Sequence, residues 1–213
     1  MVPVPRPRDC GPALWSYGRD RAPGPPTLVS MSPAAEQSEQ KALRRVATLI
    51  ARGVSQAELF AVVNQEIARL VGADAAALLR FEPDETITPL AAWNTAGKRV
   101  SLGDREPVNT ALRRLRDTAR PVRCGPSDVP VTGPFSAEIR CLGIRASVAV
   151  PIRVDGLVWG ISVAASQRPE PFPSATESRM VKFTELIAAA IGNAEGPDGV
   201  RRGAAGPGSA GPG

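Results

Sequence analysis

Residues 145–166 read RASVAVPIRVDGLVWGISVAAS, and this stretch decides the fold class. Asp155-Gly156 lies between two runs rich in β-branched residues, the pattern typical of a β-hairpin with a two-residue turn. Such a turn sets the register, and it predicts that large apolar residues pair on one face: Val154 with Leu157, Ile152 with Trp159, Val150 with Ile161, and Val148 with Val163. The other face carries mostly small residues. We therefore expect a central hairpin that is covered on both sides, with helices close to the small face.

Helices and strands are expected on both sides of this hairpin. Apolar spacing predicts helices, and capping boxes at residues 55–58 and 174–177 start two of them. Pro89 indicates an edge position or a bulge in its strand. In chain order we expect helices at 32–52 and 55–72, strands at 75–81, 86–93 and 99–102, a helix at 108–118, a strand at 121–124, a helix at 135–142, the hairpin, and a helix from 174 to about 193. This is an α+β order.

The two ends of the chain differ in composition from the middle. Prolines at 3, 5, 7, 12, 23, 25 and 26 predict a disordered, Pro- and Arg-rich segment over residues 1–37 that runs into the first helix. Met31 opens a cleaner helical sequence and is an alternative start to Met1. Residues 196–213 are rich in Gly and Pro and predict a tail. One domain over residues 38–195 remains.

Composition excludes several classes of protein. The 213 residues are 43% hydrophobic and 22% charged, as in an ordinary globular domain. The net charge of +5 comes from scattered arginines, so no nucleic-acid partner is expected. Three cysteines do not indicate a disulfide framework. There is neither an apolar run of membrane-spanning length nor an apolar leader, so we expect no membrane contact and a cytoplasmic location.

The sequence contains no histidine. This excludes a Ser-His-Asp triad, a His-ligated zinc, a histidine haem ligand and a phospho-accepting histidine within these residues. The carboxylates at 84–85, 104, 106 and 170 all fall in expected turns, where solvated side chains are the rule. No acid/base pair is therefore predicted.

Residues 58–84, 142–166 and 183–195 together resemble the GAF domain family, especially modules that precede histidine-kinase cores in actinobacterial sensor proteins. Residues 58–84 (ELFAVVNQEIARLVGADAAALLRFEPD) are similar to its second helix and first strand, and residues 142–166 are similar to its hairpin. Residues 183–195 (FTELIAAAIGNAE) are similar to its closing helix. The resemblance implies an α+β fold with a central antiparallel sheet of five to six strands. It places the N- and C-terminal helices on one face and a small-molecule pocket on the other.

On this resemblance the bulky face of the hairpin lines the pocket and the small face receives the helices. The implied pocket residues are Trp93, Leu112, Phe135, Ile139, Val148, Val150, Ile161 and Val163. No cofactor is expected. The cysteine-histidine pair of bilin-binding members and the histidine of haem-binding members are absent. Ser166, Gln167 and Thr176 replace residues of the cyclic-nucleotide signature.

The resulting hypothesis is a non-catalytic sensory or regulatory GAF domain. It binds an unknown small molecule or transmits a signal as a homodimer through its first and last helices, where Leu49, Val181 and Ala190 are the outer apolar residues. It would be the input part of a two-component sensor, with any kinase activity in a portion outside this chain. The alternative is a GAF-fold free methionine sulfoxide reductase, which would use Cys124 and Cys141.

Overall fold

The computed structural model describes residues 33–97, 100, 102–125, 133–168, 170 and 172–204, with side chains as far as residue 193. The N-terminal segment expected to be disordered lies, up to residue 32, outside the described residues. The same holds for residues 205–213 of the expected tail and for residues 99 and 101 of the strand expected at 99–102. Val100 and Leu102 are not in a strand. The third strand lies later, at Glu106–Pro107.

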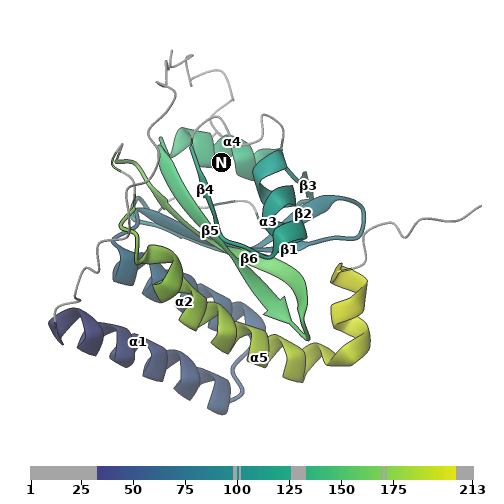
Figure 1. Cartoon of the computed structure of the whole chain (residues 1–213), viewed down its shortest axis with the longest axis horizontal. Coiled ribbons are helices and arrows are strands. Elements are labelled where there is room, and N and C mark those ends of the chain that lie inside the picture. Colours follow the sequence, from purple (N-terminus) through teal and green to yellow (C-terminus); the bar gives the residue numbers. More distant parts are fainter. Residues whose placement is uncertain are drawn as a thin grey trace, which may run out of the picture.

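A six-stranded antiparallel sheet forms the centre of the molecule (Figure 1). Its spatial order is β3-β2-β1-β6-β5-β4. The strands are β1 (Ala75–Phe81), β2 (Thr86–Asn94), β3 (Glu106–Pro107), β4 (Val122–Cys124), β5 (Ala146–Val154) and β6 (Leu157–Ser166). The β5–β6 hairpin is interior to the sheet, as expected, since β1 and β4 flank it. The predicted α+β fold with its central antiparallel sheet is confirmed.

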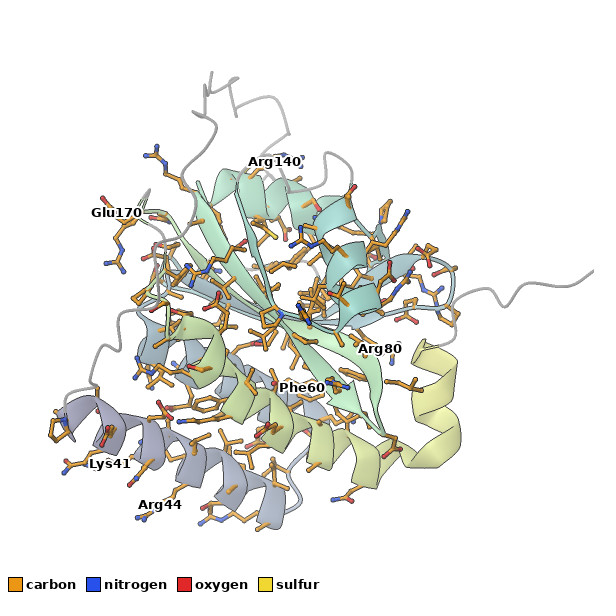
Figure 2. All side chains as sticks on the ribbon, in the orientation of Figure 1. Lys41, Arg44, Phe60, Arg80, Arg140 and Glu170 are labelled. Carbon is orange, nitrogen blue, oxygen red and sulfur yellow. The ribbon has the colours of Figure 1, made fainter. Side chains whose placement is uncertain are left out.

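Helices cover both faces of the sheet, in two unequal layers (Figure 1). The larger layer contains α1 (Pro33–Ala51), α2 (Gln56–Val71) and α5 (Thr176–Ala204), and the smaller layer contains α3 (Thr110–Thr118) and α4 (Pro134–Cys141). The first and last helices therefore share a face. Lys41 and Arg44 lie on the outer side of α1, away from the sheet (Figure 2).

Local signals explain where most of these elements begin and end. The Ser55 side chain caps α2 by accepting a hydrogen bond from the Glu58 backbone N–H. Gly72 ends that helix in the left-handed conformation that glycine favours. In β2 the pairing with β1 shifts between Leu78 and Leu79, next to Pro89, so the predicted bulge is present. The capping role predicted for Glu177 is wrong, because its carboxylate instead pairs with Arg123 of β4.

The hairpin has the predicted turn but not the predicted register. Asp155 and Gly156 both have positive φ, and Val154 pairs with Leu157. A β-bulge then shifts the pairing between Ile152 and Arg153, so that Ile152 pairs with Gly160 and Val150 with Ser162. Because β6 gains one residue at the bulge, the side chains beyond it change face. The predicted pairs Ile152–Trp159, Val150–Ile161 and Val148–Val163 are wrong for this reason.

The main core lies between the sheet and the α1, α2 and α5 layer. It contains Val148, Val150, Ile152 and Val154 from β5 with Trp159 from β6. From α5 it receives side chains without solvent exposure: Met180, Phe183, Ile187 and Ile191. The Trp159 and Phe60 rings meet at a centroid separation of 6.3 Å. Burying each such side chain stabilises the fold by ~1.5–3 kcal/mol. The bulky face of β5 therefore receives the helices, the reverse of the prediction.

Buried carboxylates tie the three helices of this layer together. Glu39 of α1 is buried and pairs with Arg179 and Lys182 of α5. Glu66 of α2 is also buried and accepts hydrogen bonds from Arg45 of α1. Removing both cations that pair with one of these carboxylates would leave a buried charge without compensation, which costs far more than the ion pairs themselves contribute.

Helix α5 extends beyond the prediction that ended it near residue 193, because the backbone stays helical to Ala204. It changes direction near its end, in the yellow part of the ribbon (Figure 1). A proline lies at position 197, and proline within a helix removes one hydrogen bond and bends the axis. In the part of the chain that the structure describes, no helix combines the length and apolarity needed to cross a bilayer.

Candidate ligand-binding site

A cavity of about 110 Å³ lies on the sheet face opposite α1, α2 and α5. Its floor comes from β1, β5 and β6, and it is partly open to solvent. Several floor residues are small, namely Ala75, Ala77, Ala149 and Ala165. Because these side chains stop at Cβ, they leave space between the sheet and the helices above it.

Large apolar side chains form the walls and the cover of the cavity. Leu79, Ile161 and Val163 rise from the sheet. Leu112 of α3 and Phe135 and Ile139 of α4 close it from above. Asn109 holds the start of α3 in place, since its side chain accepts a hydrogen bond from the Leu112 backbone N–H at 2.8 Å. An apolar lining with a few placed polar groups is typical of small-molecule sites.

The charged group in this lining is the carboxylate of Glu106, on the short strand β3. It is only 2% exposed. It accepts a hydrogen bond from the Ser136 backbone N–H at 3.0 Å and a second from the Ser136 hydroxyl. Helix α4 begins after Gly133, which has no side chain to cap it. Glu106 therefore supplies, from another element, the acceptor that the first turn of α4 needs.

Gly133 is required at this junction for a second reason. A Cβ there would lie 2.2 Å from the Glu106 Oε1 atom, and the residue has a φ of +102°. Both the close approach and the backbone conformation favour glycine. Gly133, Ser136 and Glu106 thus fasten α4 to β3 at the edge of the cavity.

Arg123 connects the cavity wall to the start of α5. Its neighbour Cys124 lines the cavity, and β4 pairs with β5. The Arg123 guanidinium donates to both carboxylate oxygens of Glu177 at 2.6 and 2.8 Å. It also donates to the carbonyls of Phe172 and Pro173, which precede α5. These contacts join β4 directly to the start of α5.

Comparison with known families identifies the fold. A family model described as "GAF domain" matches residues 56–194, which is more than half of the chain. The chain belongs to the GAF domain family. Together with the fold, this confirms the resemblance to the GAF family that was inferred from residues 58–84, 142–166 and 183–195.

Curated relatives of this GAF domain include anaerobic nitric oxide reductase transcription regulators named NorR. The one from Aeromonas hydrophila is 28% identical over 159 residues, and the one from Klebsiella pneumoniae is 25% identical over the same length. Each match covers 71% of this chain but 30% of the relative. The chain therefore spans about a third of the length of the curated relatives that it matches.

Solved structures share the fold at lower identity. The phycocyanobilin-bound GAF domain of a cyanobacterial phytochrome superposes with a TM-score of 0.61 at 18% identity, over 78% of this chain and 97% of that chain. The GAF domain of a phosphoenolpyruvate-protein phosphotransferase from Acinetobacter gives 0.59 at 17% identity, over 77% of this chain and 96% of that chain. At this identity the similarity concerns the fold alone.

The GAF domain brings six of the eight predicted pocket residues together around the cavity. These are Trp93, Leu112, Phe135, Ile139, Ile161 and Val163. Val148 and Val150 instead lie fully buried beneath the helices, on the other face of the sheet. The bulge in the hairpin causes this error, because it separates the β5 valines from the β6 residues that were predicted to share their face. That the six bind a ligand stays a prediction.

Sequence reasoning missed Glu106 and Ser136 as residues of the cavity. It placed Glu106 with Asp104 in a solvated turn, but Glu106 is buried and belongs to β3. A two-residue edge strand is too short to produce a recognisable sequence pattern. The contact with Ser136 joins residues thirty positions apart, so it leaves no local signal either. The one local signal near this contact is the proline after Gly133, because proline is typical of the first position of a helix.

No disulfide joins the two described cysteines, which lie in different surroundings. Cys124 is half-buried and lines the cavity, whereas Cys141 is exposed at the end of α4 and does not line it. The reductase alternative needs a nucleophile and a resolving thiol together at one site.

Among the described residues, no cluster of three or more Cys, Asp or Glu side chains could hold a metal ion.

Proposed function

We propose that this GAF domain is a non-catalytic sensory module that binds a small molecule in the cavity and reports its presence through α1 and α5. The observation that carries the proposal is the placement of an apolar cavity on one sheet face and of both terminal helices on the other. A ligand in the cavity can then change the sheet without contacting the helices that lead to the rest of a protein.

The relatives support a regulatory role. They include a transcription regulator and the chromophore-binding domains of phytochromes, and in both the matched region is part of a larger protein. We infer a comparable role for this chain, as the cytoplasmic input part of a longer signalling protein. Its resemblance to domains that precede histidine-kinase cores favours a two-component sensor.

The contacts of Arg123 provide a route for the signal. Its four hydrogen bonds join β4 to the first turn of α5. Further along α5, Arg179 and Lys182 pair with Glu39 of α1. A ligand that displaces Cys124 in the cavity wall would move α5, and α5 would move α1. The coupling requires that the ligand bind more tightly to one arrangement of β4 and α5 than to the other.

We also propose that the domain forms a homodimer through α1 and α5. The outer apolar residues named for this contact, Leu49, Val181 and Ala190, are partly buried and already pack against the core of their own chain. The interface must therefore use the exposed surfaces of both helices as well. Size-exclusion chromatography with light scattering tests this proposal, and a monomer at high concentration contradicts it.

A ligand screen with a matched cavity-filling variant tests the sensory function. Ala77 lies on the cavity floor, so Ala77→Leu fills the space while circular dichroism checks the fold. Compounds that bind the cavity should raise the Tm of the wild-type chain but not that of the variant, because a ligand that binds only the native state stabilises it. Their binding should also shift the backbone NMR signals at the start of α5. The proposal fails if no compound in a broad library distinguishes the two proteins.

A further inference from the structure

Glu106 differs from every other buried carboxylate in the described part of the chain. The others are Glu39, Glu66 and Glu82, and each has two cationic partners within 4.0 Å. Glu106 is the most deeply buried of the four and has no such partner among the described residues. Its hydrogen-bond donors are the backbone N–H and the hydroxyl of Ser136.

A buried carboxylate without a counter-charge destabilises the folded state, because it loses its hydration and gains no ion pair. Capping α4 offsets part of this cost, since the N-terminus of a helix carries a partial positive charge. The two donors from Ser136 nevertheless occupy only part of the carboxylate, which offers about four acceptor positions. The remaining positions are available to a donor that enters the cavity lined by Glu106.

The rest of the lining restricts the polarity and size of the part of the ligand that does not contact Glu106. Leu112, Phe135, Ile139, Ile161 and Val163 surround the cavity with apolar surface. Ser147 and Asn109 are already engaged, Ser147 with the Cys124 carbonyl and Asn109 with the Leu112 backbone N–H. The volume of about 110 Å³ compares with the roughly 150 Å³ of an engineered apolar cavity that binds benzene. The enclosed space therefore takes at most about one ring or a short branched chain, and the cavity is partly open to solvent.

We propose that the cavity binds a small organic amine, with its ammonium group on the Glu106 carboxylate and its apolar body among the residues of α3, α4 and β6. The inference rests on the proposed sensory function and specifies its ligand class. The same carboxylate repels carboxylates and phosphates, because a second negative charge in this apolar site would have no cation to pair with.

Three probes with the same phenyl ring test the ligand class on the full 213-residue chain. They are benzylamine, toluene and benzoate, which carry a positive charge, no charge and a negative charge, respectively, and calorimetry or NMR titration measures their affinities. We expect benzylamine to bind at least tenfold more tightly than toluene, since hydrogen bonds to charged groups contribute about 1.5–3 kcal/mol. Benzoate should show no binding.

Glu106→Gln removes the charge but keeps acceptor and donor atoms for Ser136, so α4 stays capped. We expect it to weaken benzylamine binding about tenfold or more and to leave toluene binding unchanged within about twofold. Glu185→Gln is the matched control, because Glu185 is exposed on α5. It should change neither affinity.

The outcomes separate this inference from the proposed function. If toluene binds as tightly as benzylamine, or if Glu106→Gln does not distinguish them, the cavity is a ligand site but not an amine site. Preferential binding of benzoate overturns the inference directly. If none of the three probes binds, the amine inference also fails, and the broad screen against the Ala77→Leu variant decides the sensory function separately.

Discussion

Replacing Gly160 by alanine should be one of the most damaging single-methyl changes in this domain. Gly160 follows Trp159 at the bulge of β6 and pairs with Arg80 of β1. A Cβ built there would lie 2.4 Å from the Leu79 carbonyl oxygen and 3.2 Å from the Arg80 Cα atom. Both neighbours are backbone atoms, so no side-chain rotation relieves the overlap.

The magnitude follows from how far the backbone must move. Ordinary contacts begin at 3.4 Å, so β1 and β6 would have to separate by about 1 Å at Leu79. Overpacking typically costs ~1–3 kcal/mol, and weakened ladder hydrogen bonds add ~1 kcal/mol each. Alanine also lowers the conformational entropy of the unfolded chain, which offsets about 0.4–1 kcal/mol of this destabilisation. We expect the free energy of unfolding to fall by ~2–4 kcal/mol, and the Tm by roughly 4–16 °C.

Gly192 provides the matched control. It lies in α5, where a Cβ would meet the Val154 Cγ1 atom at 3.5 Å, an ordinary contact. Gly192→Ala should therefore stabilise the protein by ~0.5–1 kcal/mol, because alanine is the better helix former. Urea denaturation followed by far-ultraviolet circular dichroism measures both variants. If Gly160→Ala lies within 1 kcal/mol of the wild type, the close approach of β1 and β6 is not as described.

Substitutions at three further positions test the turn, the contact between β4 and α5, and an electrostatic contact. Asp155 has a φ of +50°, so Asp155→Val should cost ~1–2 kcal/mol in thermal denaturation whereas Asp155→Asn should be nearly neutral; equal loss in both would contradict the turn geometry. Arg123→Ala removes the contacts with Glu177 at a part-exposed site and should lower the free energy of unfolding by about 1 kcal/mol, and no change in urea midpoint would argue against the contact. The hydrogen bond from Thr86, followed by Arg105, holds the pKa of Asp84 below its ordinary value, so the stability from this carboxylate is present above its ordinary pKa and is lost as the pH falls through the lowered one. Thr86→Val should raise the pKa of Asp84 in an NMR titration, and an unchanged pKa would refute the assigned cause.

The α+β class and most element positions followed from local sequence, whereas the six cavity residues rested on the resemblance to the GAF family. Turn and cap residues act over a few positions, so Asp155-Gly156, Ser55 and Gly72 could be interpreted without knowledge of the fold. Apolar spacing likewise identified the buried side of α5, including Phe183 and Ile187. These signals belong to single elements, and the structure confirms them.

The bulge in the hairpin could not be predicted from the local sequence. The small face of the hairpin, to which Gly160 belongs, was predicted to let a helix approach, but the group that approaches Gly160 is the backbone of β1. The bulge shifts Trp159 to the helix face and leaves Ile161 and Val163 at the cavity. One extra residue reverses the side-chain alternation, and nothing in the pattern of apolar residues distinguishes it from a regular strand.

The sequence by itself therefore determined the RASVAVPIRVDGLVWGISVAAS hairpin, its turn and its central place, because hydrophobic burial and turn chemistry are encoded in neighbouring residues. Tertiary structure alone decided which face of that hairpin meets the cavity and which meets α5. It also decided that Glu106, thirty residues from Ser136, is buried at the edge of the cavity. Burial and charge compensation depend on elements that are distant in sequence, and their meeting is a property of the packed fold.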